Sequence, residues 1–237
     1  MTIYAPWARH YDAIHAFKDY ETESARLLSL IRTLHPKARS LLDIACGTGR
    51  HLQLLAAEMQ VEGLDCNPEL LAVARERMPA TPLHCARMED FTLPRRFDAI
   101  SCMFSSIGFV GTPEQLNMTI ANMSRHLEPG GLLVIEPWFT RESFWTGTIV
   151  SRFLDEPELK IAWMYTTGLE DGLSILDNHF QIGTRQGIEN FREVHRLGLF
   201  SPEDFSVAFE QAGLARIPVQ DRAWKRGLHV ARRLQSP

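Results

Sequence analysis

Short apolar runs alternate with segments of helical periodicity between residues 40 and 136. Runs of this length, bounded by glycine, proline or charged residues, are typical of buried strands in a parallel sheet. Asn67 and Thr112, each followed by proline, are good N-caps for two of the helices between them. The second of these helices is expected to end after Leu127, where residues 128–131 would stop it. The predicted strands lie at residues 41–45, 60–65, 82–86, 96–104 and 132–135.

The pattern is different on either side of this region. Residues 1–35 predict helices that end before His35-Pro36, with aromatic residues mostly on one face. After residue 137 the chain predicts two long antiparallel strands joined by a turn at 170–172. A third strand, a helix capped at Ser201 and two final strands follow. These later strands are expected at residues 159–167, 173–182, about 188–200, 214–219 and 228–234.

Together these elements predict an α/β fold: a doubly wound, mostly parallel sheet of seven strands with an antiparallel, β-rich insert. The last two strands would give the sheet an antiparallel edge. The expected organisation is a helical lid at 1–35, a ligand-binding Rossmann-like core at 36–136, the insert at 137–200, and a C-terminal helix with the last core strands at 201–237.

Composition and charge narrow the class of protein. A chain of 237 residues suits one α/β domain with an insertion. A net charge of −4 without a basic cluster argues against nucleic acid as a partner. No apolar run suits a membrane span and no signal pattern is evident, so we expect a cytoplasmic protein. The cysteines lack metal-binding spacing and are expected to be reduced, small apolar side chains, without a disulfide or a metal site. They are Cys46, Cys66, Cys85 and Cys102.

The turn after the first strand carries the strongest chemical signal. An acid on the strand precedes two glycines in the pattern Asp43-x-x-x-Gly47-x-Gly49, and a helix follows. Glycine lets the backbone turn sharply and approach a ligand, which in a doubly wound sheet lies outside the carboxyl end of the strand. A dinucleotide fingerprint would have a third glycine where Leu52 stands, which opposes a nicotinamide oxidoreductase.

A second acid, Asp65, closes the second strand 16 residues after Gly49. A carboxylate at this place can accept hydrogen bonds from both ribose hydroxyls of an adenosyl ligand. The alternative is a carboxylate that only caps the following helix. Beside the glycine turn, the ribose role is favoured.

These motifs resemble those of class I S-adenosylmethionine-dependent methyltransferases. Over nearly the whole chain, the sequence is most similar to one branch, the N,N-dimethyltransferases that act on nucleotide-linked amino sugars in macrolide biosynthesis. The matching segments are Tyr11-Asp12, Lys18-Asp19-Tyr20, residues 42–49, 102–108 and 125–131, Glu136-Pro137-Trp138 and Arg226-Gly227-Leu228.

The resemblance implies S-adenosyl-L-methionine as the cofactor and a small-molecule acceptor such as a nucleoside-diphosphate sugar. It places Tyr11 near the transferred methyl group, as the catalytic residue, and Arg226 at a phosphate of the acceptor. Because Arg222 and Lys225 are close by, the alternative for Arg226 is a solvated basic tail. The implied cofactor-binding residues are Tyr11, Tyr20, Asp43, Ala45, Cys46, Gly47, Gly49, Asp65, Cys66, Met88, Glu89, Cys102, Met103 and Phe104. The implied acceptor-binding residues are Ser105, Ser106, Phe109, Trp138 and Arg226.

Two positions depart from the family pattern. An acid usually precedes the apolar residue over the adenine, but here Arg87 precedes Met88, so that Glu89 or Asp90 would replace it. Histidine often follows Ser-Ile-Gly and faces the acceptor, whereas this chain has Phe109. The second departure favours an alternative, an N- or O-methyltransferase of another small metabolite. A non-catalytic binding module also stays open, because binding motifs alone do not show turnover.

Methyl transfer from a sulfonium to an amine is a one-step displacement, so the protein chiefly aligns the reactants and excludes water. We expect Tyr11 to orient the acceptor, without a dedicated strong base. His126 is expected at a helix end that faces away from the site, and His51 on a helix surface. The β-rich insert is expected to form one wall of the acceptor pocket or an oligomer surface, which allows a homodimer.

Overall fold

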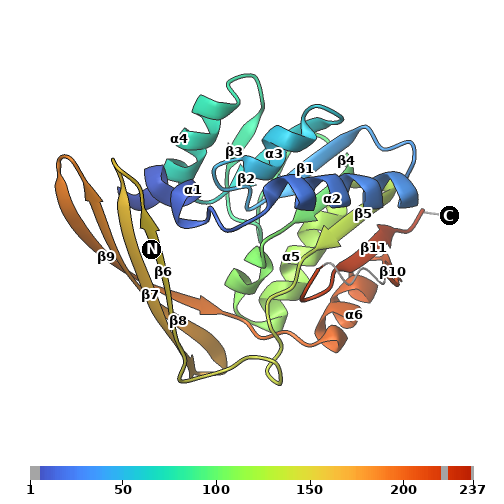
Figure 1. Ribbon diagram of the computed structural model, residues 1–237. Helices are drawn as coiled ribbons and strands as arrows, with labels where there is room; N and C mark the ends of the chain where they lie inside the picture. The colour runs from blue at the N-terminus through green and yellow to red at the C-terminus, as the bar shows by residue number, and fades with distance from the viewer. Residues whose placement is uncertain (1–5, 220–223, 236–237) are drawn as a thin grey trace.

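The computed structural model describes residues 6–219 and 224–235 (Figure 1). Its main sheet has seven strands in the order β10-β11-β5-β4-β1-β2-β3, which confirms the predicted doubly wound fold. Neighbouring strands are parallel except at β11, which runs antiparallel to both β5 and β10. The last two strands, β10 and β11, therefore form an antiparallel pair at one edge of the sheet, as predicted. The strands are β1 (Ser40–Ile44), β2 (Gln60–Asp65), β3 (Leu83–Cys85), β4 (Phe97–Cys102), β5 (Leu127–Ile135), β10 (Leu214–Ile217) and β11 (His229–Arg233).

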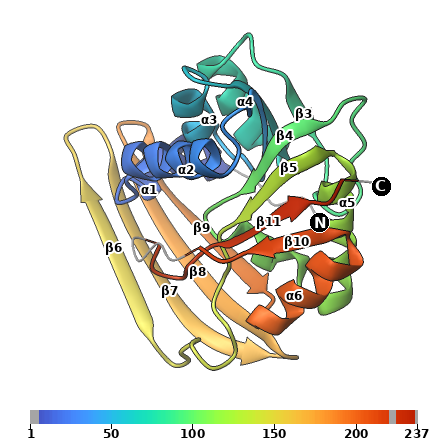
Figure 2. The same cartoon turned by 90° about the vertical axis from the view of Figure 1, so that its right-hand side faces the viewer.

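Helices cover both faces of this sheet (Figure 2). One face packs against α2 (Tyr20–Leu34), α3 (Arg50–Leu55) and α4 (Pro68–Arg77). The other packs against α5 (Pro113–Arg125) and α6 (Pro202–Gln211). In β1, Leu41 packs in the apolar cluster on the side of α2, α3 and α4, and Leu42 packs in the cluster on the side of α5 and α6. Burial on both faces is the reason that these strands are continuous apolar runs in the sequence. Within the described ranges, every helix is too short or too polar to cross a membrane.

A second, antiparallel sheet, called sheet B, contains the strands between residues 149 and 197 in the order β6-β7-β8-β9. β7 and β8 are joined at Asp171 and Gly172, whose φ angles of 51° and 80° suit a two-residue hairpin turn. Figure 1 shows sheet B beside the main sheet, with α1 (Tyr11–Ile14) near its upper end. The strands are β6 (Ile149–Asp155), β7 (Lys160–Glu170), β8 (Leu173–Thr184) and β9 (Gly187–Leu197).

Contacts at Ile14 and at Gly198 help to attach sheet B to the rest of the molecule. Ile14 of α1 is buried in the apolar cluster of this sheet, with Ile161 and Phe180. At the end of β9, the Gly198 N–H donates to the Gly108 carbonyl at 2.7 Å. Gly108 lies in η2 (Ser106–Val110), the short helix that follows β4. Sheet B is therefore fixed both to the N-terminal helices and to the loop at the carboxyl end of β4.

Three elements differ from the predictions. The helix α5 ends at Arg125 and β5 begins at Leu127, because residues 128–131 bulge out of a strand that pairs with β4 on both sides of the bulge. The edge strand β6 has no predicted counterpart, because its residues are mostly exposed and do not alternate. The N-terminal helical segment is divided into η1 (Pro6–His10), α1 and α2, because Asp19 accepts a hydrogen bond from Thr22 N–H and caps a new helix.

Candidate functional site

The turn after β1 brings backbone N–H groups to the carboxyl end of the main sheet. Ala45, Gly47 and Gly49 have φ angles of 57°, 56° and 77°, in the left-handed region. A Cβ atom on Gly47 would meet no atom within 4 Å, so this part of the turn borders open space. Gly63 of β2 lets the turn pack closely, because a Cβ there would lie 2.8 Å from the Cys46 sulfur. Gly63 was not predicted as part of the site, although a glycine inside a predicted strand is a signal of close backbone approach.

Asp65 stands at the end of β2 with its carboxylate held by backbone N–H groups. Gly47 N–H donates to Oδ2 and Asn67 N–H to Oδ1, each at 2.8 Å. Each oxygen keeps a further lone pair, so the carboxylate can still accept two hydroxyl hydrogens. Burial raises the pKa of this carboxyl, and the N–H bonds counteract the effect. The side chain of Asn67 caps α4, so the helix has its cap without the Asp65 side chain.

Asp43 lies deeper, inside the sheet. Its carboxylate accepts a hydrogen bond from the Ser101 hydroxyl of β4 at 2.7 Å, and burial raises its pKa. The side chains of Cys102 and Met103 are also buried in the core. At these three positions the side chains support the strands from which the turn and the β4 loop extend.

The N-terminal helices are attached to the glycine turn through Asp12 of α1. The Asp12 carboxylate accepts a hydrogen bond from the Thr48 hydroxyl at 2.6 Å and pairs with Arg77 of α4. Arg77 also donates to the Thr48 carbonyl. The neighbouring residue, Tyr11, has a pKa raised well above its usual value, mainly by burial and also by charges that include Asp65 and Glu193. Its phenol therefore stays protonated and is suited to donate a hydrogen bond.

His15, directly after α1, lies where the N-terminal helices, β4 and sheet B meet. Its ring centroid is 4.2 Å from that of Tyr11, 5.4 Å from Phe104 and 5.6 Å from Trp163 of β7. The Nδ1 atom is 2.9 Å from the Tyr11 carbonyl oxygen, so Nδ1 carries the hydrogen. Burial lowers the pKa of His15 to about 4, so the ring is neutral near pH 7. His15 and Trp163 were not predicted as site residues, because local sequence patterns do not show which elements meet in the fold.

The loop after β4 is held by Glu136, at the end of β5. Phe104 and Ser105 have φ angles of 55° and 60°, which are unusual for residues other than glycine. Phe104 N–H donates to Glu136 Oε2, and the Ser105 hydroxyl donates to the Pro137 carbonyl, each at 2.8 Å. Arg226 pairs with the other Glu136 oxygen at 2.7 Å. Glu136 therefore holds both the loop and Arg226. The resemblance at Glu136-Pro137-Trp138 did not predict this role.

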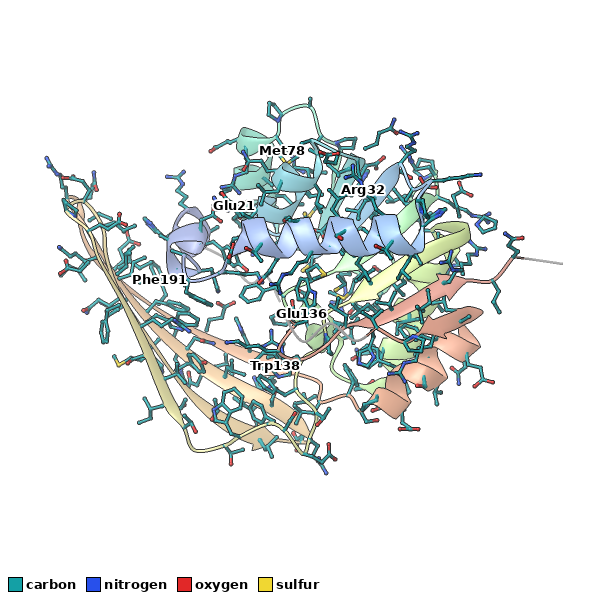
Figure 3. All side chains as sticks on the ribbon, turned by 45° about the vertical axis from the view of Figure 1, so that its right-hand side comes forward. Glu21, Arg32, Met78, Glu136, Trp138 and Phe191 are labelled. Atoms are coloured by element: carbon teal, nitrogen blue, oxygen red, sulfur yellow. The ribbon has the colours of Figure 1, made fainter. Side chains whose placement is uncertain are left out.

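The predicted acceptor residues occupy two places. The guanidinium of Arg226 lies 5.7 Å from the ring centroid of Trp138, whose indole N–H donates to the Ser174 hydroxyl of β8 at 2.9 Å. Figure 3 shows Glu136 and Trp138 on the side of the core that faces sheet B. Phe109 is elsewhere, in η2 beside His195 of β9, with ring centroids 5.3 Å apart. Arg222 lies outside the described residues.

The segments at the carboxyl ends of β2 and β3 contain two cysteines that are not buried as expected. Met88 is half-buried, and Arg87 pairs with Glu89 at 2.5 Å. Cys66 and Cys85 are exposed, whereas Cys46 and Cys102 are buried; all four are free thiols. The expectation of apolar fillers is therefore wrong for two cysteines, which stand at or after the carboxyl ends of β2 and β3.

His51 and His126, the two histidines expected to lie outside the catalytic site, have partners within the protein. His51 is buried, not on a helix surface as expected, because α2 packs over α3. Its Nε2 atom is 3.1 Å from Glu23, and its ring centroid is 4.9 Å from that of Tyr20. His126 lies at the C-terminal end of α5 as predicted, with Nδ1 2.9 Å from the Asn122 carbonyl. In the described part of the chain, no group of three or more His, Cys, Asp or Glu side chains could hold a metal ion.

A doubly wound sheet with this glycine turn and an acid at the end of β2 fits a nucleotide-like ligand outside the carboxyl ends of the strands, and the comparisons define the class as a methyltransferase whose cofactor is S-adenosyl-L-methionine. Residues 41–131 match the family model described as a methyltransferase domain. The residues fit an adenosyl cofactor, because Gly47 borders open space and both Asp65 oxygens keep a lone pair.

The comparisons define the family more narrowly. The chain is 39% identical over 212 residues to dTDP-3-amino-3,6-dideoxy-alpha-D-glucopyranose N,N-dimethyltransferase of Streptomyces fradiae, covering 88% of this chain and 83% of the relative. It is 34% identical to DesVI of Streptomyces venezuelae, whose crystal structure matches with a TM-score of 0.90 over 98% of this chain and 99% of that one. CalS10, an amino pentose methyltransferase from Micromonospora echinaspora solved with bound S-adenosylmethionine, is 34% identical and matches with a TM-score of 0.85, over 98% and 99% of the two chains. The chain belongs to the family of dTDP-amino-sugar N,N-dimethyltransferases.

Proposed function

We propose that this protein transfers methyl groups from S-adenosyl-L-methionine to the amino group of a dTDP-linked amino sugar in natural-product biosynthesis. One observation carries the proposal. The likeness to the amino-sugar enzymes extends well beyond residues 41–131, the part that matches a general methyltransferase domain, and includes sheet B and the last strands. Sheet B supplies Trp163, Glu193 and His195 next to the N-terminal helices, which supports a role in binding the acceptor.

The cofactor, when bound, supplies a methyl group on a positively charged sulfur. We propose that Asp65 accepts the ribose hydroxyls, that Met88 covers the adenine, and that the Tyr11 phenol donates a hydrogen bond beside the methyl group. The remaining cofactor contacts are proposed at Tyr20, Asp43, Ala45, Cys46, Gly47, Gly49, Cys66, Glu89, Cys102, Met103 and Phe104. The side chains of Asp43, Cys102 and Met103 are buried, which supports a contact with the cofactor through their backbone atoms or an indirect role in which they hold the strands in place.

Arg226 is the proposed partner of a phosphate of the acceptor. A guanidinium has five N–H donors, and the bonds to Glu136 and to the Pro137 carbonyl use two of them. Trp138 lies beside it and is the proposed wall for the nucleotide. Ser106 and Phe109 of η2 line the proposed acceptor side, and Ser105 supports their loop.

Two further features concern location and partners. The four free cysteines support the cytoplasm as the compartment. On the outer face of sheet B, Ile149 and Phe153 are 74% and 71% exposed, which supports a homodimer through this sheet.

Calorimetry tests the proposed function. S-adenosylhomocysteine is titrated first, and thymidine diphosphate is then added to the complex; we expect both to bind. Mass spectrometry should then find the methyl group on the sugar nitrogen after incubation with the cofactor. In Arg226→Ala we expect thymidine diphosphate to bind about tenfold more weakly, because one charge-assisted hydrogen bond is lost, while S-adenosylhomocysteine binds as before. Binding of S-adenosylhomocysteine alone would keep the methyltransferase and overturn the nucleotide-sugar acceptor.

A further inference from the structure

Glu193 and His195 of β9 form a pair on the inner face of sheet B. The His195 Nε2 atom lies 3.2 Å from Glu193 Oε1. The side chains are mostly buried, with exposed fractions of 12% for Glu193 and 25% for His195. Arg192 and Arg196 are exposed, because successive side chains of a strand point to opposite faces. The pair therefore faces the core, and its arginine neighbours face solvent.

The position of β9 brings this pair to the loop at the end of β4. The His195 ring packs edge-on against Phe109 of η2, with centroids 5.3 Å apart. Just beyond it, the hydrogen bond from Gly198 N–H to the Gly108 carbonyl fixes β9 to the same short helix. His195 is therefore held at the loop next to the strand end where the methyl donor is expected.

The electrostatics link the pair to the N-terminal helices. The charge of Glu193 is among those that raise the pKa of Tyr11, and the charge of His195 helps to lower the pKa of His15. The ionisable groups around the pair are thus His15, which interacts with His195, and Tyr11, which interacts with Glu193. From η2, the residue packed against it is Phe109, which carries no ionisable group.

One atom of the pair lacks a protein partner. Glu193 Oε2 is buried and accepts no hydrogen bond within the described residues. A buried carboxylate oxygen without a donor is costly, because no hydrogen bond compensates for its loss of hydration. Such an atom indicates a ligand that brings an N–H or O–H group to this place.

We propose that His195, oriented by Glu193, contacts the acceptor amine and takes the proton that the amine must release between two methyl transfers. The inference rests on the proposed function. Because Nε2 faces the Glu193 carboxylate at 3.2 Å, the nitrogen of His195 that accepts the proton is Nδ1. Glu193 Oε2 accepts a hydrogen bond from the acceptor, and the carboxylate stabilises the imidazolium that forms.

The chemistry requires such a proton acceptor. In the first transfer, the lone pair of the amine nitrogen forms the new N–C bond, and the electron pair of the broken S–C bond stays on sulfur. The product nitrogen is then positively charged and has no lone pair. One N–H proton passes to His195, the electron pair of that bond returns to nitrogen, and the nitrogen can attack a second methyl group. Each displacement itself proceeds without a strong base, in agreement with the expectation from the sequence.

The test follows the two transfers separately. The parent protein, His195→Asn and Glu193→Gln are incubated with S-adenosylmethionine and a dTDP-linked amino sugar over a range of pH, and mass spectrometry measures mono- and dimethylated product. In His195→Asn we expect the second transfer to slow about 100-fold near neutral pH. Monomethylated sugar should accumulate, and the deficit should shrink as pH rises, because solvent then takes the proton. Glu193→Gln should show the same defect in weaker form.

His179→Asn is the matched control. His179 forms a similar pair with Asp177, also at 3.2 Å, but on the outer face of sheet B, where its side chain is 58% exposed. We expect this variant to behave like the parent. A readout that does not need turnover is the imidazole NMR signal of His195, assigned by its absence in His195→Asn. It should shift when the amino sugar is added to the complex with S-adenosylhomocysteine.

The outcomes are distinct. An unchanged pH profile and an unchanged mono-to-dimethyl ratio in His195→Asn would overturn the inference and leave the proposed function intact. A parent protein that binds S-adenosylhomocysteine but methylates no nucleotide-linked amino sugar would overturn the proposed function, and the inference with it. If His195→Asn fails to bind S-adenosylhomocysteine, Glu193→Gln decides, because it keeps the shape of the side chain.

Discussion

Tyr11 interacts with residues from the N-terminal segment, the main sheet and sheet B. Its neighbours include His15 by ring contact, and Asp65 and Glu193 by charge. Because burial is the largest cause of its raised pKa, the phenol keeps its proton throughout the range in which the enzyme works. The phenol is therefore suited to donate a hydrogen bond and unsuited to act as a base.

Tyr11→Phe tests this role. Removal of one hydrogen bond worth about 1–1.5 kcal/mol should lower turnover about tenfold. The affinity for S-adenosylhomocysteine should change little, because the ring remains in place. Steady-state kinetics and calorimetry measure the two quantities. Turnover equal to that of the parent would remove Tyr11 from the mechanism.

At the residue scale, the sequence indicates those site residues that belong to a local motif. Gly47 and Asp65 follow predicted strands, and their positions alone predict that they meet at one edge of the sheet. Glu136 and His15 carry no such signal. Their roles depend on contacts across the fold, such as the bond from Phe104 N–H to Glu136, between residues that are 32 positions apart.

At the scale of elements, Asp12 fixes the position of α1. This carboxylate joins three segments: α1, the glycine turn through Thr48, and α4 through Arg77. The side chains of Asp12 and Arg77 are only 29% and 18% exposed, so their attraction is less screened than that of a surface pair.

Asp12→Asn should loosen both the turn and α1. We expect S-adenosylhomocysteine to bind about tenfold more weakly and the free energy of unfolding to fall by about 1–2 kcal/mol, because Arg77 loses its charged partner. Calorimetry and urea unfolding measure these changes. The control is Asp155→Asn, which removes the exposed pair with Lys160 on sheet B and should alter neither quantity. Equal effects of the two variants would mean that the Asp12 contacts do not hold the turn.

The accuracy of the predicted elements follows from how locally each one is determined. The helix α4 begins as predicted because Asn67 caps it and Pro68 suits its first turn. The boundary between α5 and β5 was wrong because residues 128–131 have the composition of a helix stop but lie as a bulge within a strand. Pairing with β4 decides this outcome, and pairing is not visible in the local sequence.

At the scale of the whole molecule, the site needs two sheets that the sequence cannot place relative to each other. The hairpin of sheet B is predictable from its turn residues. Its position is set by contacts between segments far apart in the chain, namely Ile14 with Ile161 and Gly198 with Gly108. The acceptor side of the site was for this reason less predictable than the cofactor side, which lies within one strand–turn–helix unit and its neighbours.

Both parts of the molecule also contain a histidine that burial keeps neutral. His15 lies against sheet B, and His229 in β11 stacks on Phe205 with ring centroids 3.9 Å apart. Burial lowers the pKa of each from 6.5 to about 4. Between these two pH values the unfolded chain binds more protons than the folded chain. The folded state is therefore favoured fully above about pH 6.5 and loses stability as pH falls toward 4, by up to about 3 kcal/mol for each histidine.

Urea unfolding over this pH range tests the effect. Asp43 and Asp65 act in the opposite sense, because burial raises their pKa and the folded state then gains protons as pH falls. The histidine contribution is isolated by comparison of variants, since His229→Gln keeps both carboxyl groups. We expect this variant to lose less stability between pH 6.5 and 4 than the parent. His179→Gln, an exposed histidine, should follow the parent curve. If all three curves run parallel, acid destabilisation arises elsewhere and the buried rings are not its cause.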